Sequence, residues 1–393
     1  MLIRSATIKR NSSIGRINLL EDRYMGNQYK LNNSFKGKSV LVTGHTGFKG
    51  SWLTAWLKLL GANVTGISLD APTVPSHFIA SRLFEDIKDL RIDVRNQLSI
   101  ENAILEAQPD FVFHLAAQSL VRKSYENPIE TWQTNVIGTL HVLEALRKLQ
   151  KSCSVVIVTS DKCYNNVEWS WGYRETDPLG GADPYSASKG AAEFAINSYV
   201  KSFFPSATSK VRIASARAGN VIGGGDWAED RVIPDCIKSW STNSPAKLRN
   251  PSATRPWQHV LEPLSGYLSL AMELQDNTNL HGEAFNFGPN SQTDRSVLDL
   301  VSEMSRHWSQ VKWSIEQTKL NEHYEAGLLK LNCDKASRLL NWRSSLNFSD
   351  TVRMTAEWYQ FYYQNPAIIQ SKSAEQISEY VEFAAGQGLQ WTQ

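Results

Sequence analysis

The sequence predicts an α/β fold: a doubly wound parallel sheet followed by a smaller, discontinuous C-terminal domain. From Ser39 onward, short β-branched segments alternate with longer amphipathic ones, and nearly every position of each short segment is apolar. Strands of that kind are typical of a parallel sheet with helices on both faces. After about Gly219 the composition shifts to loops rich in Gly, Pro and Trp, which indicates a second unit beside the sheet.

Each element of the first unit follows from this alternation. Strands are expected at 39–43, 63–68, 89–93, 111–115, 154–160 and 211–217. Helices are expected between them at 49–60, 97–108, 129–149 and 183–202. The chain then divides into a disordered extension at 1–34, the sheet domain at 35–218 with later segments around 255–275 returning to it, a second domain mainly at 219–365 and a C-terminal tail at 366–393.

Composition narrows the possible functions. The 393 residues are 41% hydrophobic and 20% charged, and a net charge of +2 gives no electrostatic case for binding nucleic acid or a membrane surface. No apolar stretch reaches the roughly 20 residues of a membrane span. The basic N-terminal segment has the composition of a transit peptide, but a disordered tail or an upstream extension of the reading frame is favoured. Unpaired thiols fit the reducing cytoplasm, and the chain has Cys153, Cys163, Cys236 and Cys333.

A glycine-rich turn between the first strand and the first helix predicts a dinucleotide site. In "VLVTGHTGFKGSWL", Gly44 permits the tight turn, Gly47 lets backbone approach a pyrophosphate, and Gly50 lets the helix pack close to the strand. The helix N-terminus offers N–H groups and a positive dipole end to the phosphates. Lys49 either adds charge there or is a solvated surface lysine. The sequence therefore predicts a Rossmann-type sheet.

Carboxylates at the ends of the next two strands refine the cofactor prediction. Asp70 lies 20 residues after Gly50, where a carboxylate binds ribose hydroxyls and repels a 2′-phosphate. No arginine directly follows Asp70, so NAD is favoured over NADP. Asp93 ends the third strand and is either an adenine contact or a helix N-cap. No metal site is expected.

A second group of polar residues predicts acid–base chemistry. Tyr185 and Lys189 in "YSASK" are four residues apart and share one helical face. An ammonium beside a phenol lowers the pKa of the phenol from about 10 towards neutrality, which would make Tyr185 a base for a hydroxyl. Ser160, at the end of a neighbouring strand, can hydrogen-bond the same substrate oxygen. An acid and an amine, Asp161 and Lys162, follow it directly.

These motifs, with "HLAAQSLVRKSY", "TNVIGTL", "NVIGGGDWAEDR" and "RPWQHVLEPL", resemble the extended short-chain dehydrogenase/reductase family from residue 36 to about 363, and within it the CDP-glucose 4,6-dehydratases. The resemblance implies bound NAD, cytoplasmic bacterial synthesis of 3,6-dideoxyhexoses for O-antigen lipopolysaccharide, and a homodimer or homotetramer built partly through a helix bundle. It also implies that Asn135 supports the active-site helix and that the cofactor is contacted by Phe48, Leu115, Ala116 and Ala117 as well as Tyr185 and Lys189.

The same resemblance implies that the chain dehydrates CDP-D-glucose to CDP-4-keto-6-deoxy-D-glucose. Tyr185 would take the C-4 hydroxyl proton while hydride passes to NAD⁺, and the ketone would acidify the C-5 hydrogen. Asp161, kept neutral by burial, would protonate the departing C-6 hydroxyl. Lys162 would remove the C-5 proton, or else only pair with Asp161; dehydratases of dTDP- or GDP-sugars carry Glu in its place. Hydride would then return to C-6.

Substrate contacts and rival functions stay open at this point. Asn220 resembles the amide that binds a sugar-nucleotide pyrophosphate. Arg231 and Arg255 are either phosphate partners, since a planar guanidinium suits bidentate contact, or members of surface ion pairs. The rivals are another nucleotide-sugar dehydratase, a 4-epimerase of the same fold, which needs no acid–base pair for water loss, and a non-catalytic NAD-binding regulator.

Overall fold

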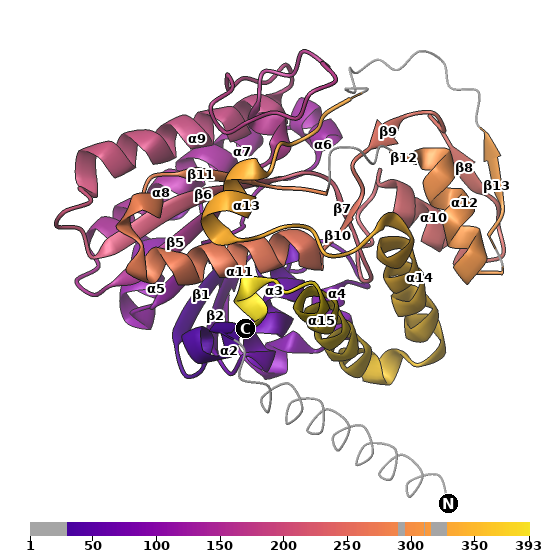
Figure 1. Cartoon of the computed structure of the whole chain (residues 1–393), viewed down its shortest axis with the longest axis horizontal. Helices are drawn as coiled ribbons and strands as arrows, with labels where there is room; N and C mark the ends of the chain where they lie inside the picture. Colours follow the sequence, from indigo (N-terminus) through magenta and orange to yellow (C-terminus); the bar gives the residue numbers. More distant parts are fainter. Residues whose placement is uncertain (1–29, 290–294, 310, 316–327) are drawn as a thin grey trace, which may run out of the picture.

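A seven-stranded parallel sheet forms the centre of the molecule, whose computed structural model describes residues 30–289, 295–309, 311–315 and 328–393 (Figure 1). Its strand order is β11-β6-β5-β4-β1-β2-β3. The chain adds strands outward on one side of β1 and then, from β4, on the other side, as in doubly wound dinucleotide-binding folds. Neighbouring strands are parallel throughout. The strands are β1 (Ser39–Thr43), β2 (Asn63–Ser68), β3 (Lys88–Arg91), β4 (Phe111–His114), β5 (Cys153–Val158), β6 (Val211–Ala218) and β11 (Ala284–Phe287).

The predicted doubly wound sheet is confirmed, and the first two strands have the expected bounds. The seventh strand, β11, was not expected. Its four residues, "AFNF", alternate too briefly to be distinguished from a loop, and only the pairing with β6 makes them a strand. The helix expected at 129–149 consists of α7 (Pro128–Trp132), a π-helical turn (Gln133–Ile137) and α8 (Gly138–Arg147).

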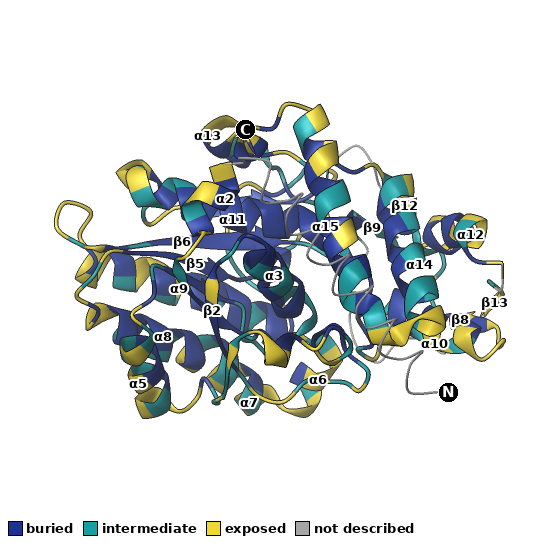
Figure 2. Cartoon of the chain, turned by 90° about the horizontal axis from the view of Figure 1, so that it is seen from below, coloured by how far each residue is buried: buried dark blue, intermediate teal, exposed yellow. Residues whose placement is uncertain are grey.

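Helices cover both faces of the sheet, because successive side chains of a strand point to opposite faces. On one face, Leu41, Val112 and Val155 share a core with side chains of three helices, α5 (Gln97–Ala107), α8 and α9 (Pro184–Phe203). On the other face, Val40 and Phe113 share a core with α3 (Phe48–Leu59) and α11 (Leu261–Asp276). Figure 2 shows the buried sheet between these two layers.

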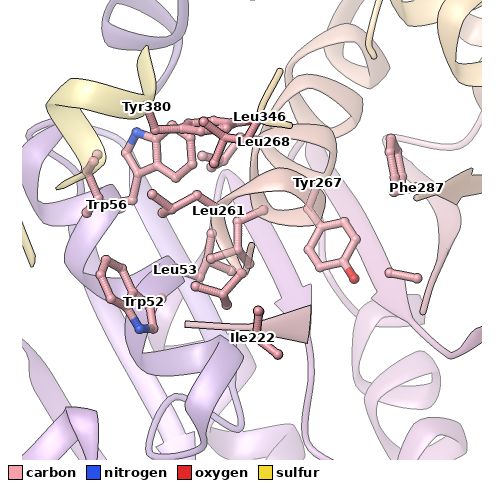
Figure 3. Packing of buried hydrophobic residues seen from close by; sticks show 14 of the residues in the cluster. Trp52, Leu53, Trp56, Ile222, Leu261, Tyr267, Leu268, Phe287, Leu346 and Tyr380 are labelled. Carbon is pink, nitrogen blue, oxygen red and sulfur yellow. The ribbon is translucent and has the colours of Figure 1, made fainter. Parts of the chain in front are cut away.

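Figure 3 shows how the second of these cores is built. Trp52 and Trp56 of α3 are both fully buried and face Leu261 of α11. Tyr380 of α15 (Ile369–Gly386) packs against Trp56 in the same core. The ring of Trp56 meets that of Tyr380 edge-on at a centroid distance of 5.7 Å. Side chains one helical turn apart thus supply a continuous apolar stripe against the sheet.

Smaller elements gather beside the carboxyl end of the sheet (Figure 1). Three two-stranded ribbons pair β7 (Val221–Ile222) with β10 (Gln258–His259), β9 (Thr254–Arg255) with β12 (Arg295–Ser296) and β8 (Ala246–Leu248) with β13 (Trp313–Ile315). The longer helices of this region are α10 (Val232–Ser241), α12 (Val297–His307) and α14 (Phe348–Gln364). Further short helices are α2 (Lys30–Phe35), α4 (His77–Ala80), α6 (Val121–Glu126) and α13 (Asp334–Leu340).

Both ends of the described chain lie against the sheet domain. Residues 366–393, expected as a C-terminal tail, contain α15, which packs on α3 and α14. The carbonyl of Gln393 accepts a 2.9 Å hydrogen bond from the backbone N–H of Lys30 in α2. Of the expected N-terminal extension, residues 1–29 lie outside the described residues. Within the described ranges, no helix is both long and apolar enough to cross a membrane.

Candidate active site

The turn from β1 into α3 requires glycine at its tightest points. Gly44 has a φ of +76°, and a Cβ there would lie 2.7 Å from the backbone nitrogen of Ala116. At Gly50, a Cβ would collide with the carbonyl of Gly44. The first turn of α3 carries no acidic residue, so no carboxylate neutralises the positive end of the helix dipole that its free N–H groups form. This turn, closed from below by Leu115 to Ala117, fits a dinucleotide pyrophosphate.

Two carboxylates follow the next strands, and their surroundings differ from the expectation in part. Asp70 has a 98% exposed side chain just past β2, with Nη1 of Arg91 3.6 Å from its Oδ1. That arginine comes from β3, so a search of the residues directly after Asp70 could not find it. Asp93 binds the guanidinium and backbone N–H of Arg95. The N-cap of α5 is Asn96, so the N-cap interpretation of Asp93 was wrong.

The end of β5 carries the acid–amine pair. Ser160 caps the short helix η3 (Asp161–Cys163): its Oγ accepts from the backbone N–H of Lys162 at 3.2 Å and donates to Oδ1 of Asp161 at 2.9 Å. Asp161 is buried, and this burial raises the pKa of its carboxyl, although Lys162, Ser160 and Lys49 oppose the shift. A buried carboxyl whose pKa is raised can keep its proton for general-acid chemistry.

Helix α9 presents Tyr185 and Lys189 to the same place. Pro184 occupies its first turn, and Oδ1 of the N-cap Asp183 accepts a 2.9 Å hydrogen bond from the backbone N–H of Ser186. Nζ of Lys189 donates to the carbonyl of Val158, 3.3 Å away, at the end of β5. The two side chains therefore stand against the strand that leads into Ser160.

The protonation of this pair differs from the sequence-based expectation. Burial raises the pKa of Tyr185 to about 12, and a hydrogen bond with Ser160 only partly opposes it. Burial also lowers the pKa of Lys189 to about 8, with Cys163 and Glu193 acting in the opposite direction. We expected the ammonium of Lys189 to lower the pKa of the phenol. Desolvation raises it instead, and the groups that oppose this rise are Ser160 and Arg231.

Asn135 ties the active-site helix to the segment after β4. Its Oδ1 accepts from the backbone N–H of Gln118 at 2.8 Å, and its Nδ2 donates to the carbonyl of Gln118 and to Oγ of Ser188. Oγ of Ser188 in turn donates to the carbonyl of Tyr185 at 2.7 Å. The side chain of Asn135 thus bridges the π-helical turn, the segment after β4 and α9.

Lys49 is the clearest site residue whose position the sequence left open. Burial lowers its pKa to about 8; the carboxylate of Asp161 opposes this shift, while Arg231 and Lys189 add to it. Its side chain is half-buried and close enough to Asp161 for their charges to interact, which favours a role in the charged cluster around Asp161 over a solvated surface lysine. The glycine motif predicts that position 49 lies in the first turn of a helix, but only the fold shows which groups surround the Lys49 side chain.

The predicted substrate-binding residues lie along the links that follow β6. Asn220 is half-buried next to Gly219, and a Cβ at Gly219 would lie 3.0 Å from Oδ2 of Asp161. Nη1 of Arg231 forms an ion pair with Oδ2 of Asp226 at 2.7 Å. Nη1 of Arg255 donates to the carbonyl of Thr254. Asn220 thus follows a residue that lies against Asp161, while Arg231 already has a carboxylate partner.

Among the residues that the structure describes, no three His, Cys, Asp or Glu side chains are grouped to hold a metal ion.

Comparison with known proteins identifies the family to which the chain belongs. Residues 41–355 match the family model described as GDP-mannose 4,6 dehydratase. A CDP-glucose 4,6-dehydratase of Salmonella typhimurium is 46% identical over 354 residues, which cover 89% of this chain and 98% of that relative. A probable dTDP-glucose 4,6-dehydratase of Sinorhizobium fredii is 26% identical, covering 81% and 92%.

Solved structures show the same fold. An epimerase from Methanothermobacter thermautotrophicus has a TM-score of 0.71 at 23% identity and covers 86% of this chain and 96% of its own. A UDP-glucuronic acid 4-epimerase from Bacillus cereus has a TM-score of 0.70 at 23% identity, with coverage of 82% and 99%. The family match and the 46% identity together show that the chain belongs to the GDP-mannose 4,6 dehydratase family and is a homologue of CDP-glucose 4,6-dehydratase.

Proposed function

We propose that this protein is an NAD-dependent CDP-glucose 4,6-dehydratase that produces CDP-4-keto-6-deoxy-D-glucose. The observation that carries the proposal is the Asp161–Lys162 pair at the end of β5, next to Tyr185 and Lys189, in a chain 46% identical to a CDP-glucose 4,6-dehydratase. Dehydration needs an acid for the C-6 hydroxyl and a base for the C-5 proton, and this pair supplies one of each.

The β1–α3 turn and the residues around it would hold the cofactor. Backbone N–H groups after Gly47 face the pyrophosphate position, Asp70 suits the ribose hydroxyls, and Leu115 to Ala117 lie beneath the turn at Gly44. A bound NAD would supply the hydride acceptor for C-4 and the hydride donor for C-6, so it would not be consumed. Phe48 and Asp93 remain proposed contacts on the same grounds of position.

Each catalytic side chain has one task in this reaction. Tyr185 accepts the proton of the C-4 hydroxyl as a phenolate, and Ser160 hydrogen-bonds the same oxygen. Burial disfavours that phenolate by raising the pKa of Tyr185 to about 12, so positive charge on Lys189 is needed to stabilise it. Asp161 protonates the departing C-6 hydroxyl, since burial raises its pKa. Lys162 removes the C-5 proton and must be neutral when it does so.

Substrate specificity tests the proposal directly. Purified protein with NAD is given CDP-, dTDP-, UDP- and GDP-glucose separately, and the 4-keto product is followed by its absorbance in alkali. We expect kcat/KM to be highest for CDP-glucose, with Asn220, Arg231 and Arg255 as the proposed contacts to the nucleotide sugar. Preference for another nucleotide would keep the dehydratase reaction and reject the CDP assignment.

Lys162→Met in deuterated water separates the proposed base from its alternative. C-4 oxidation needs Tyr185 and Lys189, so reduced NAD should still form, whereas deuterium entry at C-5 and water loss should stop. Near-normal turnover would show that Lys162 only pairs with Asp161 and that another group is the base. The rival functions are tested with the wild-type protein. Formation of a C-4 epimer without water loss would support a 4-epimerase, and absence of any reduced cofactor would support a non-catalytic NAD-binding role.

Exposed apolar side chains on two neighbouring helical segments support a homodimer. Ile129 is 69% exposed and Trp132 38% in α7, while Phe194 in α9 is 60% exposed. Apolar side chains gathered on helices that lie side by side favour a helix-bundle contact between two copies. Light scattering should show a dimer or tetramer for the wild type and loss of that assembly for Phe194→Glu.

The proposed location is the cytoplasm, which suits the four free thiols of the chain.

A further inference from the structure

A buried ion pair lies directly behind the active-site segment and is not part of the mechanism above. Nη2 of Arg217 in β6 is 2.8 Å from Oε2 of Glu193 in α9, and Nε of Arg217 donates to Oε1 at 2.9 Å. Both side chains are almost fully buried, at 4% and 5% exposure. Oγ1 of Thr159 and Oγ of Ser215 donate to the same carboxylate, which is therefore fully partnered.

The carboxylate continues the row of catalytic side chains on α9. Tyr185, Lys189 and Glu193 follow one another at intervals of four residues, so they share one face of the helix. Lys189 binds the carbonyl of Val158 and Glu193 binds the hydroxyl of Thr159. Val158, the last residue of β5, and Thr159 directly after it are thus held by consecutive turns of α9, directly before Ser160.

The arginine holds the other end of the same segment. Nη1 of Arg217 donates to the hydroxyl of Tyr164 at 2.8 Å, and the guanidinium carbon lies 4.9 Å from the centroid of the Tyr164 ring. The Tyr164 hydroxyl donates onward to Oδ1 of Asn286 in β11. Thr159 and Tyr164 flank residues 160–163, so the ion pair hydrogen-bonds the residues on both sides of the catalytic segment.

We propose that Glu193 and Arg217 are a positioning pair for the dehydratase reaction: they fix the segment 160–163 against α9, so that Ser160 and Asp161 stay aligned with Tyr185 and Lys189. This inference rests on the proposed function for its assay. A buried ion pair seldom adds net stability over a well-packed apolar pair, since desolvation offsets the attraction. The Glu193–Arg217 pair instead hydrogen-bonds the residues on both sides of segment 160–163, so alignment of that segment explains why the pair is buried there.

The pair also acts electrostatically on Lys189. Burial disfavours the ionised form of Glu193, but Arg217 and the surrounding hydroxyls hold its pKa below the ordinary value. The resulting carboxylate raises the pKa of Lys189 against burial. The other titratable groups facing that ammonium are Cys163 of η3, whose pKa burial raises so that it stays a neutral thiol, His114 of β4 and Lys49 of α3.

Three variants test the pair: Glu193→Gln, Arg217→Met and the double variant. With Glu193→Gln we expect kcat for C-4 oxidation to fall about 10- to 100-fold with KM changed less than about threefold, because alignment acts on the chemical step. The alkaline limb of the pH–rate profile for C-4 oxidation, the step that needs the charged form of Lys189, should move to lower pH, since Lys189 loses the carboxylate that favours this form. ¹⁵N-lysine NMR without substrate should show the same shift in the titration of Lys189.

The double variant separates alignment from folding. Replacing both charges removes the uncompensated arginine, so the melting temperature should recover towards that of the wild type. The loss of kcat and the shift of the Lys189 titration should persist. Recovery of kcat and of the titration along with the melting temperature would overturn the proposal and leave the pair a purely structural one.

Glu379→Gln is the matched control, because it removes a carboxylate from the Arg353–Glu379 ion pair of α14 and α15. It should change neither the pH profile nor the Lys189 titration. The substrate panel described above keeps the two proposals apart: if wild-type protein oxidises a different nucleotide sugar, the variants are assayed with that sugar. Unchanged kcat and an unchanged Lys189 titration in Glu193→Gln would reject the positioning role whatever the substrate.

Discussion

Oγ of Ser160 donates a 2.9 Å hydrogen bond to Oδ1 of Asp161, while the same oxygen accepts from the backbone N–H of Lys162. One hydroxyl thus caps η3 and orients the carboxyl that we propose as the acid of the reaction. Burial raises the pKa of Asp161, so its acid form persists to higher pH than that of an exposed aspartate. Ionisation of Asp161 would therefore stop dehydration on the alkaline side of the pH profile.

Asp161→Asn should separate the two halves of the reaction. The amide keeps the shape and the contact with Ser160 but cannot give a proton to the C-6 hydroxyl. We expect dehydration to fall about 10²- to 10⁴-fold, the usual worth of a general acid, while reduced NAD accumulates. Rapid mixing with absorbance at the wavelength of reduced NAD measures this. Equal loss of both steps would place Asp161 in C-4 oxidation instead.

Gly44→Ala should weaken cofactor binding. The residue has a φ of +76°, and a Cβ would lie 2.7 Å from the backbone nitrogen of Ala116, so the turn must distort. A cost of about 1–3 kcal/mol corresponds to a Kd for NAD raised roughly five- to 150-fold. Isothermal titration with NAD measures the change.

Gly386→Ala is the control for this variant. Position 386 ends α15, and a Cβ there meets nothing within 4 Å. Its affinity for NAD should equal that of the wild type. Unchanged NAD binding in Gly44→Ala as well would mean that the cofactor does not depend on the β1–α3 turn.

The sequence was sufficient for the features that repeat locally. Apolar strands, the glycine turn and the spacing of Tyr185 and Lys189 each follow from neighbouring residues, and the fold confirms the sheet that they predict. The Ser160–Asp161–Lys162 run could be placed at a strand end for the same reason. Roles for those side chains remain predictions until the variants above are measured.

Features that depend on distant partners could not be read in this way. Arg217 meets Glu193 only because β6 lies beside β5, under α9. Arg91 of β3 approaches Asp70 only because β3 lies beside β2, and β11 becomes a strand only by pairing with β6. The pKa of Tyr185 also depends on total burial, which no local motif encodes.

Lys49→Met should change the pH dependence of dehydration. Lys49 lowers the pKa of Asp161, so removing its charge should let burial raise that pKa further and move the alkaline limb upward. Steady-state rates from pH 6 to 10 measure the limb, and KM for CDP-glucose should change less than about threefold. Lys58→Met, in the last turn of the same helix, is the matched control.

A different result for Lys49→Met would assign the residue elsewhere. Weaker binding of NAD or CDP-glucose with an unshifted pH profile would make Lys49 a phosphate contact, which the sequence left open. The two outcomes are distinguishable because a phosphate contact acts on affinity, whereas a neighbour of Asp161 acts on its protonation.

Glu262 should make the stability of the fold depend on pH. It is fully buried in α11, and its carboxylate accepts from the backbone N–H groups of Ser345 and Leu346 and from the hydroxyl of Tyr380. Burial raises its pKa from 4.5 to about 7 despite these hydrogen bonds. The folded state thus holds a proton that the unfolded state releases between those values.

The sign of the effect follows from that difference. Stability from protonated Glu262 is fully present below the unfolded pKa and is lost as pH rises through about 7, a change of about 3 kcal/mol. Glu262→Gln, which cannot ionise, should flatten this part of the curve. Denaturant unfolding at intervals from pH 5 to 8 measures it, with Glu379→Gln as the control. Equal slopes in wild type and Glu262→Gln would show that the hydrogen bonds from Ser345, Leu346 and Tyr380 outweigh burial and keep the carboxylate ionised.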